Sequence, residues 1–129
     1  MQYKVSELSG ALLDAAVAKA EGLPFLIESF MMVPPKPIAC WLKVQGRLPV
    51  YEDGPYAPST EWEAGGPIIQ RDGISVMYDD LAKDGFCAWI GVPKDIDGVD
   101  AEGVRGEAPL IAAMRCLVSS KYGDVVDLP

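Results

Sequence analysis

The sequence predicts a single α+β domain over residues 1–129, with two main helices packed on a small, mostly antiparallel sheet. Two segments, 9–21 and 108–122, have the apolar spacing of helices. Two strand-like segments, 74–78 and 86–92, flank a short charged loop, which is typical of a β-hairpin. The chain is half apolar and 23% charged, a composition typical of one globular domain with its own hydrophobic core.

The first predicted helix runs from about Ser9 to Glu21. Ser9 is a suitable N-cap, and Gly22 can adopt the left-handed conformation that ends a helix. The apolar side chains share one face, and they are Leu12, Leu13, Ala16, Val17 and Ala20. We place Asp14 away from that face, so the segment is predicted to be an amphipathic helix on a core.

An apolar stretch, 23–33, leads into the sequence Pro34-Pro35-Lys36-Pro37. Proline lacks an amide donor and has a fixed φ, so we predict a loop there and exclude a helix or a central strand. Residues 38–44 are mainly apolar and predict a strand, after which Gly46 begins an irregular segment. The stretch 23–33 is too short to span a bilayer, which predicts that the protein does not enter a membrane.

The next segment contains two sets of helix start and stop signals. Ser59 or Thr60 can cap a single turn through Trp62, and Pro67 can begin a short helix that ends at Gly73. An extended conformation in place of that short helix is the alternative.

The predicted hairpin of residues 74–78 and 86–92 is followed by a Gly- and Asp-rich segment, 93–107, which we expect to be exposed. The long helix then runs from about Ala108 to Tyr122. Pro109 suits its first turn, and Gly123 stops it. This helix is apolar around most of its circumference, so we expect the rest of the molecule to enclose it. Residues 125–128 predict a final short strand.

The sequence contains no histidine, which excludes Ser-His-Asp and Cys-His nucleophile activation and histidine-bound metals. The acidic segment from Asp95 to Glu102 resembles a calcium loop only superficially, because its glycine and glutamate are misplaced. Asp79, Asp80 and Asp84 fall in a predicted hairpin turn. Exposure to water there would keep the pKa values of their carboxyl groups similar, which makes them unsuited to acid–base catalysis. We therefore predict no catalytic residue, no metal and no cofactor.

Two features are candidates for ligand binding. Ser59, Thr60, Trp62, Gly65 and Gly66 would bring hydroxyls, an indole and backbone amides together at a helix start, where small anions bind. A tight turn beneath a packed tryptophan is the structural alternative for these residues.

Arg115 is the second candidate, because an arginine within a packed helix must meet a carboxylate, reach solvent or bind an anionic ligand. The sequence leaves two interpretations of Arg115 open: it forms an internal ion pair with a carboxylate, or it binds an anionic ligand. In the ligand-binding hypothesis, Arg115 converges with the serine, threonine, tryptophan and glycine residues on one pocket.

The formal charge of −8 disfavours direct binding to nucleic acid. It suits a basic protein partner or mimicry of nucleic acid charge. Three well-separated cysteines in apolar surroundings, and a beginning without signal-peptide features, predict a cytoplasmic protein with free thiols.

Three sequence blocks carry a family resemblance. They are Glu7–Gly22, the stretch from Tyr56 to Trp62 with Gly65–Ile74, and the stretch from Pro109 to Gly123. In this order they resemble the phage NinX-like family of small proteins encoded by bacteriophages and prophages. No biochemical function is established for that family. The resemblance therefore implies an accessory protein made inside a bacterial host cell, and it supplies no ligand, cofactor, partner or catalytic residue to carry over.

Three functional hypotheses follow. The first is a non-enzymatic module that binds a host or phage protein through an acidic surface. The second is a small-molecule or anion binder, or a small enzyme, that uses the Ser59-to-Gly66 residues with Arg115. The third is a homo-oligomerising module that uses the apolar residues around Phe30, Met31 and Met32.

Overall fold

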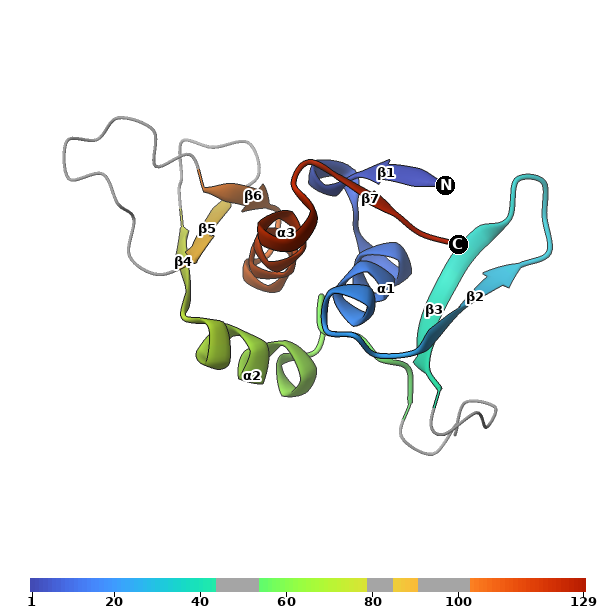
Figure 1. Cartoon of the computed structure of the whole chain (residues 1–129), viewed down its shortest axis with the longest axis horizontal. Coiled ribbons are helices and arrows are strands. Elements are labelled where there is room, and N and C mark those ends of the chain that lie inside the picture. Colours follow the sequence, from blue (N-terminus) through green and yellow to red (C-terminus); the bar gives the residue numbers. More distant parts are fainter. Residues whose placement is uncertain (44–53, 79–84, 91–102) are drawn as a thin grey trace.

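The computed structural model describes residues 1–43, 54–78, 85–90 and 103–129. The elements in chain order are β1 (Gln2–Lys4), the 3-10 helix η1 (Val5–Glu7), α1 (Gly10–Ala20), β2 (Phe25–Phe30), β3 (Lys36–Leu42), α2 (Trp62–Asp72), β4 (Ile74–Tyr78), β5 (Phe86–Ile90), β6 (Val104–Gly106), α3 (Pro109–Tyr122) and β7 (Val125–Asp127) (Figure 1). The α+β class is confirmed. The strands, however, form three separate antiparallel sheets, β1-β7, β2-β3 and β4-β5-β6.

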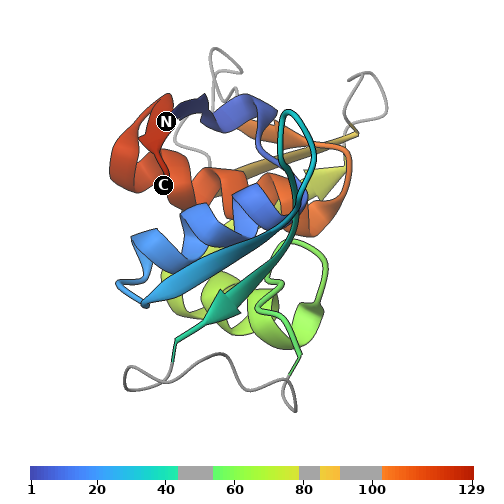
Figure 2. The ribbon, with the colours of Figure 1, turned by 90° about the vertical axis from the view of Figure 1, so that its right-hand side faces the viewer.

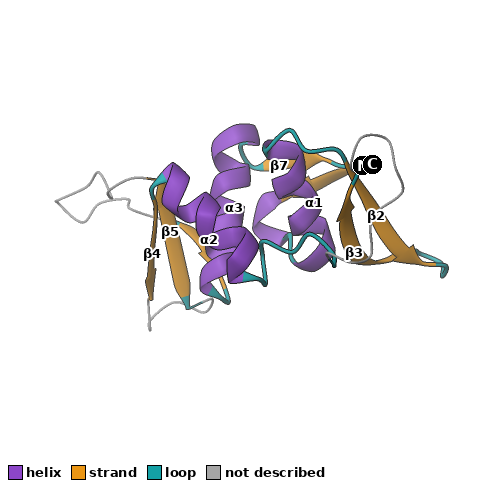
Figure 3. Ribbon diagram, turned by 90° about the horizontal axis from the view of Figure 1, so that it is seen from below, coloured by secondary structure: helices purple, strands orange, loops and turns teal. Residues whose placement is uncertain are grey.

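The helices lie between the two larger sheets (Figure 3). Helix α3 contacts all three strands of the β4-β5-β6 sheet on one side and α1 on the other. Helix α1 in turn contacts the β2–β3 hairpin, while α2 contacts β4 and α3. The core therefore follows the two central helices, with a sheet on either side of the pair.

The long C-terminal helix is enclosed as predicted. Pro109 occupies its first turn, and Gly123 follows it with a φ of +78°. Apart from half-buried Ile111, every residue from Leu110 to Val118 is buried. Because α3 is covered by both a sheet and a helix, it needs apolar or small side chains on most of its circumference.

The first helix is buried more completely than an amphipathic pattern predicts. Residues Leu13 to Ala18 are all buried, because α1 packs against α3 on one side and β3 on another. The placement of Asp14 on a polar face is therefore wrong, since this side chain is only 5% exposed. Ser9 occupies the N-cap position as predicted, but its side chain makes no capping hydrogen bond.

Pro34 and Pro35 lie in the turn of an unpredicted hairpin, whereas the loop predicted at Lys36 and Pro37 is wrong, because these two residues begin strand β3. Strand β2, which the sequence pattern did not indicate, pairs with β3 from Phe25↔Leu42 to Phe30↔Lys36. The predicted strand at 38–44 is present as β3, and it includes Pro37 because each strand of a two-stranded sheet has an open edge. Trp41 Nε1 donates across the hairpin to Glu28 Oε1 at 3.3 Å.

The predicted hairpin of β4 and β5 is confirmed, with Ile74 opposite Ile90 and Tyr78 opposite Phe86. The expectation that 93–107 is wholly exposed is wrong at its end, since β6 pairs with β5 and Gly106 is buried against α3. Residues 91–102 lie outside the described part of the chain.

The two ends of the chain lie side by side (Figure 2). Strand β7 was predicted, and it pairs with β1 so that Gln2 faces Asp127. The N-terminal ammonium group donates to Asp127 Oδ1 at 2.9 Å. Within the described ranges, no helix has both the length and the apolar character needed to cross a membrane.

Candidate functional site

The segment around Gly65 and Gly66 is one continuous helix, α2, in place of the predicted turn and separate short helix. The alternative of an extended segment from Pro67 is also wrong. Gly65 N donates to Glu61 O at 2.9 Å, so this amide belongs to the first turn of the helix. Gly73, with a φ of +64°, ends the helix at the predicted residue.

The predicted ligand-binding residues fall into two groups. Ser59, Thr60, Trp62, Gly65 and Gly66 lie around the start of α2, with Ser59 and Gly65 buried and Trp62 58% exposed. Arg115 lies in α3 and lines a cavity elsewhere in the molecule. None of the other five residues belongs to the described lining of that cavity. A ligand role for the first group stays a prediction.

Asp14 is the buried acid that sequence reasoning missed. Its Oδ1 accepts a hydrogen bond of 2.9 Å from the backbone N–H of Ser59, which links α1 to the segment before α2. Burial raises the pKa of the Asp14 carboxyl, and hydrogen bonding by Ser59 opposes part of that rise. Among the described residues, the buried Ser59 Oγ has no hydrogen-bond partner. The only signal in the sequence was the run of small apolar residues on both sides of Asp14.

The raised pKa of Asp14 predicts a pH dependence of stability. The native state holds this proton more tightly than the unfolded chain, so the contribution of Asp14 is fully present below about pH 4 and is lost as the pH rises through the native pKa. We expect the free energy of unfolding of the natural protein, minus that of Asp14→Asn, to fall as the pH rises. Urea unfolding of both proteins at intervals between about pH 4 and pH 8 measures this difference.

Asp127→Asn is the control with the opposite sign. The N-terminal ammonium group lowers the pKa of Asp127, so its contribution is present above the unfolded pKa and is lost as the pH falls below about 4. Urea unfolding of Asp127→Asn is therefore extended below about pH 4, and the two differences should change in opposite directions as the pH rises. If the difference in free energy of unfolding between the natural protein and Asp14→Asn stays constant or rises with pH, Asp14 is not a desolvated acid.

Two further titratable groups lie close to Asp14. Burial, and then the charge of Asp14, raises the pKa of the Cys40 thiol to about 12. Burial also raises the pKa of Tyr56 to about 12, and Tyr56 N donates to Cys40 O at 2.8 Å. Both side chains therefore stay protonated at neutral pH, as does Cys116, whose pKa burial raises to about 11.

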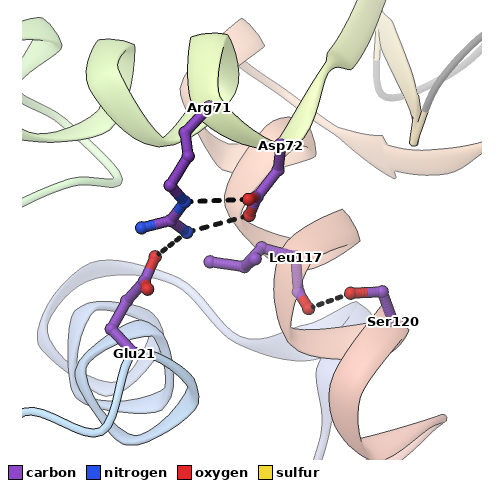
Figure 4. A network of polar contacts seen from close by, with 5 residues as sticks. All are labelled: Glu21, Arg71, Asp72, Leu117 and Ser120. Carbon is purple, nitrogen blue, oxygen red and sulfur yellow. Dashed lines mark hydrogen bonds and ion pairs between the residues drawn. The ribbon is translucent and has the colours of Figure 1, made fainter.

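An exposed ionic network joins the ends of two helices (Figure 4). Arg71, near the end of α2, donates from Nη2 to Glu21 Oε1 at 2.6 Å and from Nε to Asp72 Oδ1 at 2.8 Å. Hydrogen bonding from Arg71 lowers the pKa of Asp72. Exposed pairs of this kind contribute about 1 kcal/mol or less each, so the network positions the helix ends more than it stabilises the fold.

Arg115 is held by backbone carbonyls from two distant segments. Its Nε donates to Leu8 O at 2.8 Å and its Nη1 to Arg105 O at 3.0 Å. The side chain also lines a cavity of about 650 Å³ between η1, β6 and the end of α3. The described lining is Lys4, Val5, Ser6, Gly103, Val104, Arg105, Arg115, Ser119, Asp124 and Val125.

The tip of the β2–β3 hairpin is an exposed apolar surface. Met31 and Val33 are fully exposed, and Phe30 and Met32 are each more than half exposed. We call these four consecutive residues the hairpin tip. It projects from the end of the molecule opposite the β4-β5-β6 sheet (Figure 1).

Within the described ranges, no three acidic or cysteine side chains are grouped closely enough to hold a metal ion. The acidic segment from Asp95 to Glu102 lies outside the described residues, as do Asp79, Asp80 and Asp84.

Comparison with known proteins places the chain beside one family. The model of the family described as Bacteriophage P22, NinX matches residues 4–121, which is most of the chain. The match confirms the resemblance carried by the three sequence blocks, and it supports a phage accessory protein. The sequence matches no curated protein.

Proposed function

The chain belongs to the Bacteriophage P22 NinX family, and on this premise we propose that it is a non-enzymatic protein-binding module acting in the host cytoplasm. Its partner is a host or phage protein, and the hairpin tip is its contact surface. The single observation that carries the proposal is the exposure of four consecutive apolar residues at the end of a projecting hairpin.

Exposed apolar area of this kind is unfavourable in water unless a partner covers it. Soluble monomers rarely expose large continuous apolar patches, and phenylalanine and methionine are enriched in protein interfaces. Methionine side chains also adapt to the shape of a partner. Pro34, Pro35 and Pro37 restrict the backbone beside the hairpin tip, which lowers the entropy lost on binding.

The charge of the chain favours a basic partner. A formal charge of −8 attracts a positively charged protein over several ångströms, and it raises the rate of association at low salt. Contacts between apolar groups at the hairpin tip would then supply most of the affinity.

Photo-crosslinking in phage-infected bacteria tests this proposal. A crosslinking side chain at position 31 is compared with one at position 77, because Met77 is also an exposed methionine but lies on β4, in a different sheet. We expect a discrete crosslinked partner from position 31 alone. With that partner purified, Met31→Ser should weaken binding about tenfold and Met77→Ser less than about twofold.

Salt dependence distinguishes the basic partner from other occupants of the hairpin tip. Binding should weaken markedly between about 50 and 500 mM NaCl, because salt screens the attraction between the two proteins. The proposal is wrong if crosslinks form equally from both positions. It is also wrong if sedimentation shows a concentration-dependent homodimer that Met31→Ser abolishes.

A further inference from the structure

Strand β2 has an open edge on the side away from β3. Among the described residues the β2–β3 sheet has two strands, so each strand has one edge that its partner does not occupy. The outer edge of β3 is partly covered, because Tyr56 N donates to Cys40 O at 2.8 Å. By contrast, no described segment outside the hairpin makes a backbone hydrogen bond to Phe25–Ser29. We call this row of backbone groups the open edge of β2.

The register shows which backbone groups point to the open edge. Lys43 N donates to Pro24 O at 2.9 Å, just beyond the last pair of the ladder. In an antiparallel pair, residues that bond to the partner strand alternate with residues whose N–H and C=O groups point away from it. Counting from Pro24, the outward residues of β2 are Phe25 and Ile27. Cys40, opposite Ile27, follows the same alternation, since its carbonyl group points away from β2.

The open edge of β2 lacks the features that usually keep exposed strand edges from pairing. Those features are prolines, lysines and β-bulges. Strand β3 has all of them, in Lys36, Pro37 and the extra residue Ile38, which has no partner in β2. Strand β2 contains no proline, no lysine and no extra residue. The hairpin is therefore protected along β3 and unprotected along β2.

The outer face of the hairpin combines apolar side chains with one carboxylate. The hairpin lies across α1 (Figure 2), and Cys40 is buried on the side of that helix. The pleat then places on the opposite face the cross-strand pairs Ala39 with Glu28 and Trp41 with Leu26. The ion pairs of the described residues do not include Glu28. An added strand with apolar residues and a lysine or arginine beside Glu28 would complement this face.

We propose that an extended, basic segment of a partner protein pairs with the open edge of β2 and adds a third strand to this sheet. In strand addition, main-chain hydrogen bonds supply affinity and alternate side chains supply specificity. The inference rests on the proposed function, because the same partner then covers the hairpin tip, which continues from β2 at Phe30. The charge disfavours a second copy of this chain, since two molecules of charge −8 repel each other.

Two octapeptides of equal charge, added to the free protein, test the proposal by NMR of backbone amides. One alternates valine and lysine and can form a strand. The other alternates proline and lysine and cannot, because proline has no N–H group. At saturation, the valine peptide should shift the amides of Phe25 and Ile27 and slow their hydrogen exchange about tenfold or more. The amides of Leu26 and Glu28, which point to β3, should change less, and the proline peptide should affect none of the four.

Glu28→Gln tests the charge of the added strand. Glutamine keeps an acceptor for Trp41 Nε1 but removes the carboxylate, so it should weaken binding of the valine peptide about threefold. Glu63→Gln is the matched control, because Glu63 is an exposed acid on α2. It should change the affinity less than about 1.5-fold.

Several outcomes overturn the proposal. They are a valine peptide that shifts no amide of β2, two peptides that shift these amides equally, and two variants that weaken binding equally. Exchange at Phe25 and Ile27 that slows with rising concentration of the free protein would assign the edge to a second copy. Failure of the proposed function is measured separately, by the crosslink from position 31. The valine peptide still binds β2 if position 31 captures no partner, and a captured partner does not rescue a peptide that fails to bind.

Discussion

Gly65→Ala is expected to lower the free energy of unfolding by about 3 kcal/mol. A Cβ atom added to Gly65 would overlap the carbonyl oxygen of Pro58 and lie 2.7 Å from Leu110 Cδ2. The Leu110 side chain can rotate, but the Pro58 carbonyl belongs to the backbone beside the buried Ser59. The substitution therefore forces α2 away from the segment before it, and that displacement exceeds the gain in helix propensity from alanine.

Gly66→Ala is the matched control, because an added Cβ meets no atom of a distant segment within 4 Å at that position. We expect it to change the free energy of unfolding by less than about 1 kcal/mol, since the gain in helix propensity from alanine is opposed by contact of the new Cβ with the ring of Pro67. Urea denaturation followed by circular dichroism measures both changes. Equal effects of the two substitutions would show that Gly65 is not in close contact with Pro58.

Arg115→Met should also lower the free energy of unfolding by about 3 kcal/mol. Methionine keeps most of the apolar stem but removes the donors to Leu8 O and Arg105 O. A buried carbonyl left without its donor costs about 1 to 3 kcal/mol; the contact with Leu8 O is buried and the contact with Arg105 O is partly buried. Relief from burying a charge offsets part of that loss.

Arg115→Lys should cost less than Arg115→Met, because an ammonium group keeps the charge and can reach one of the two carbonyls. Lys121→Met is the control on the exposed end of the same helix, and it should change stability by about 0.5 kcal/mol or less. Hydrogen exchange at β6 provides a second measurement, since Arg115→Met should expose the amides of this strand. Unchanged exchange and stability would mean that the guanidinium group does not hold β6 in place.

Local sequence signals were sufficient to predict the elements whose first residue, apolar periodicity and last residue are all visible in the sequence. Helix α3 begins at Pro109, ends before Gly123 and is apolar between them, so its enclosure followed from its composition. The β4–β5 hairpin was evident from two short apolar strands around a charged turn. These features depend on neighbours within a few residues, which the sequence displays directly.

Other elements depend on partners far away in the chain. Strand β2 lacks a clear alternation of apolar and polar residues, and it is defined by pairing with β3. The three residues of β6 are a strand because β5 and α3 hold them. Helix α2 continues through Gly65 and Gly66, although the pair was interpreted as a break, because the first glycine lies against Pro58 and Leu110.

The candidate sites divide in the same way. The sequence by itself determined that Arg115 is a charge within a packed helix, that histidine chemistry is absent and that Phe30, Met31 and Met32 form an apolar run. Only the tertiary structure decided that Arg115 meets Leu8 and Arg105, that Asp14 is buried against Ser59, and that Lys4 and Arg105 line one cavity. The reason is physical: side-chain periodicity is a property of neighbouring residues, whereas burial and hydrogen-bond partners depend on how distant segments pack together.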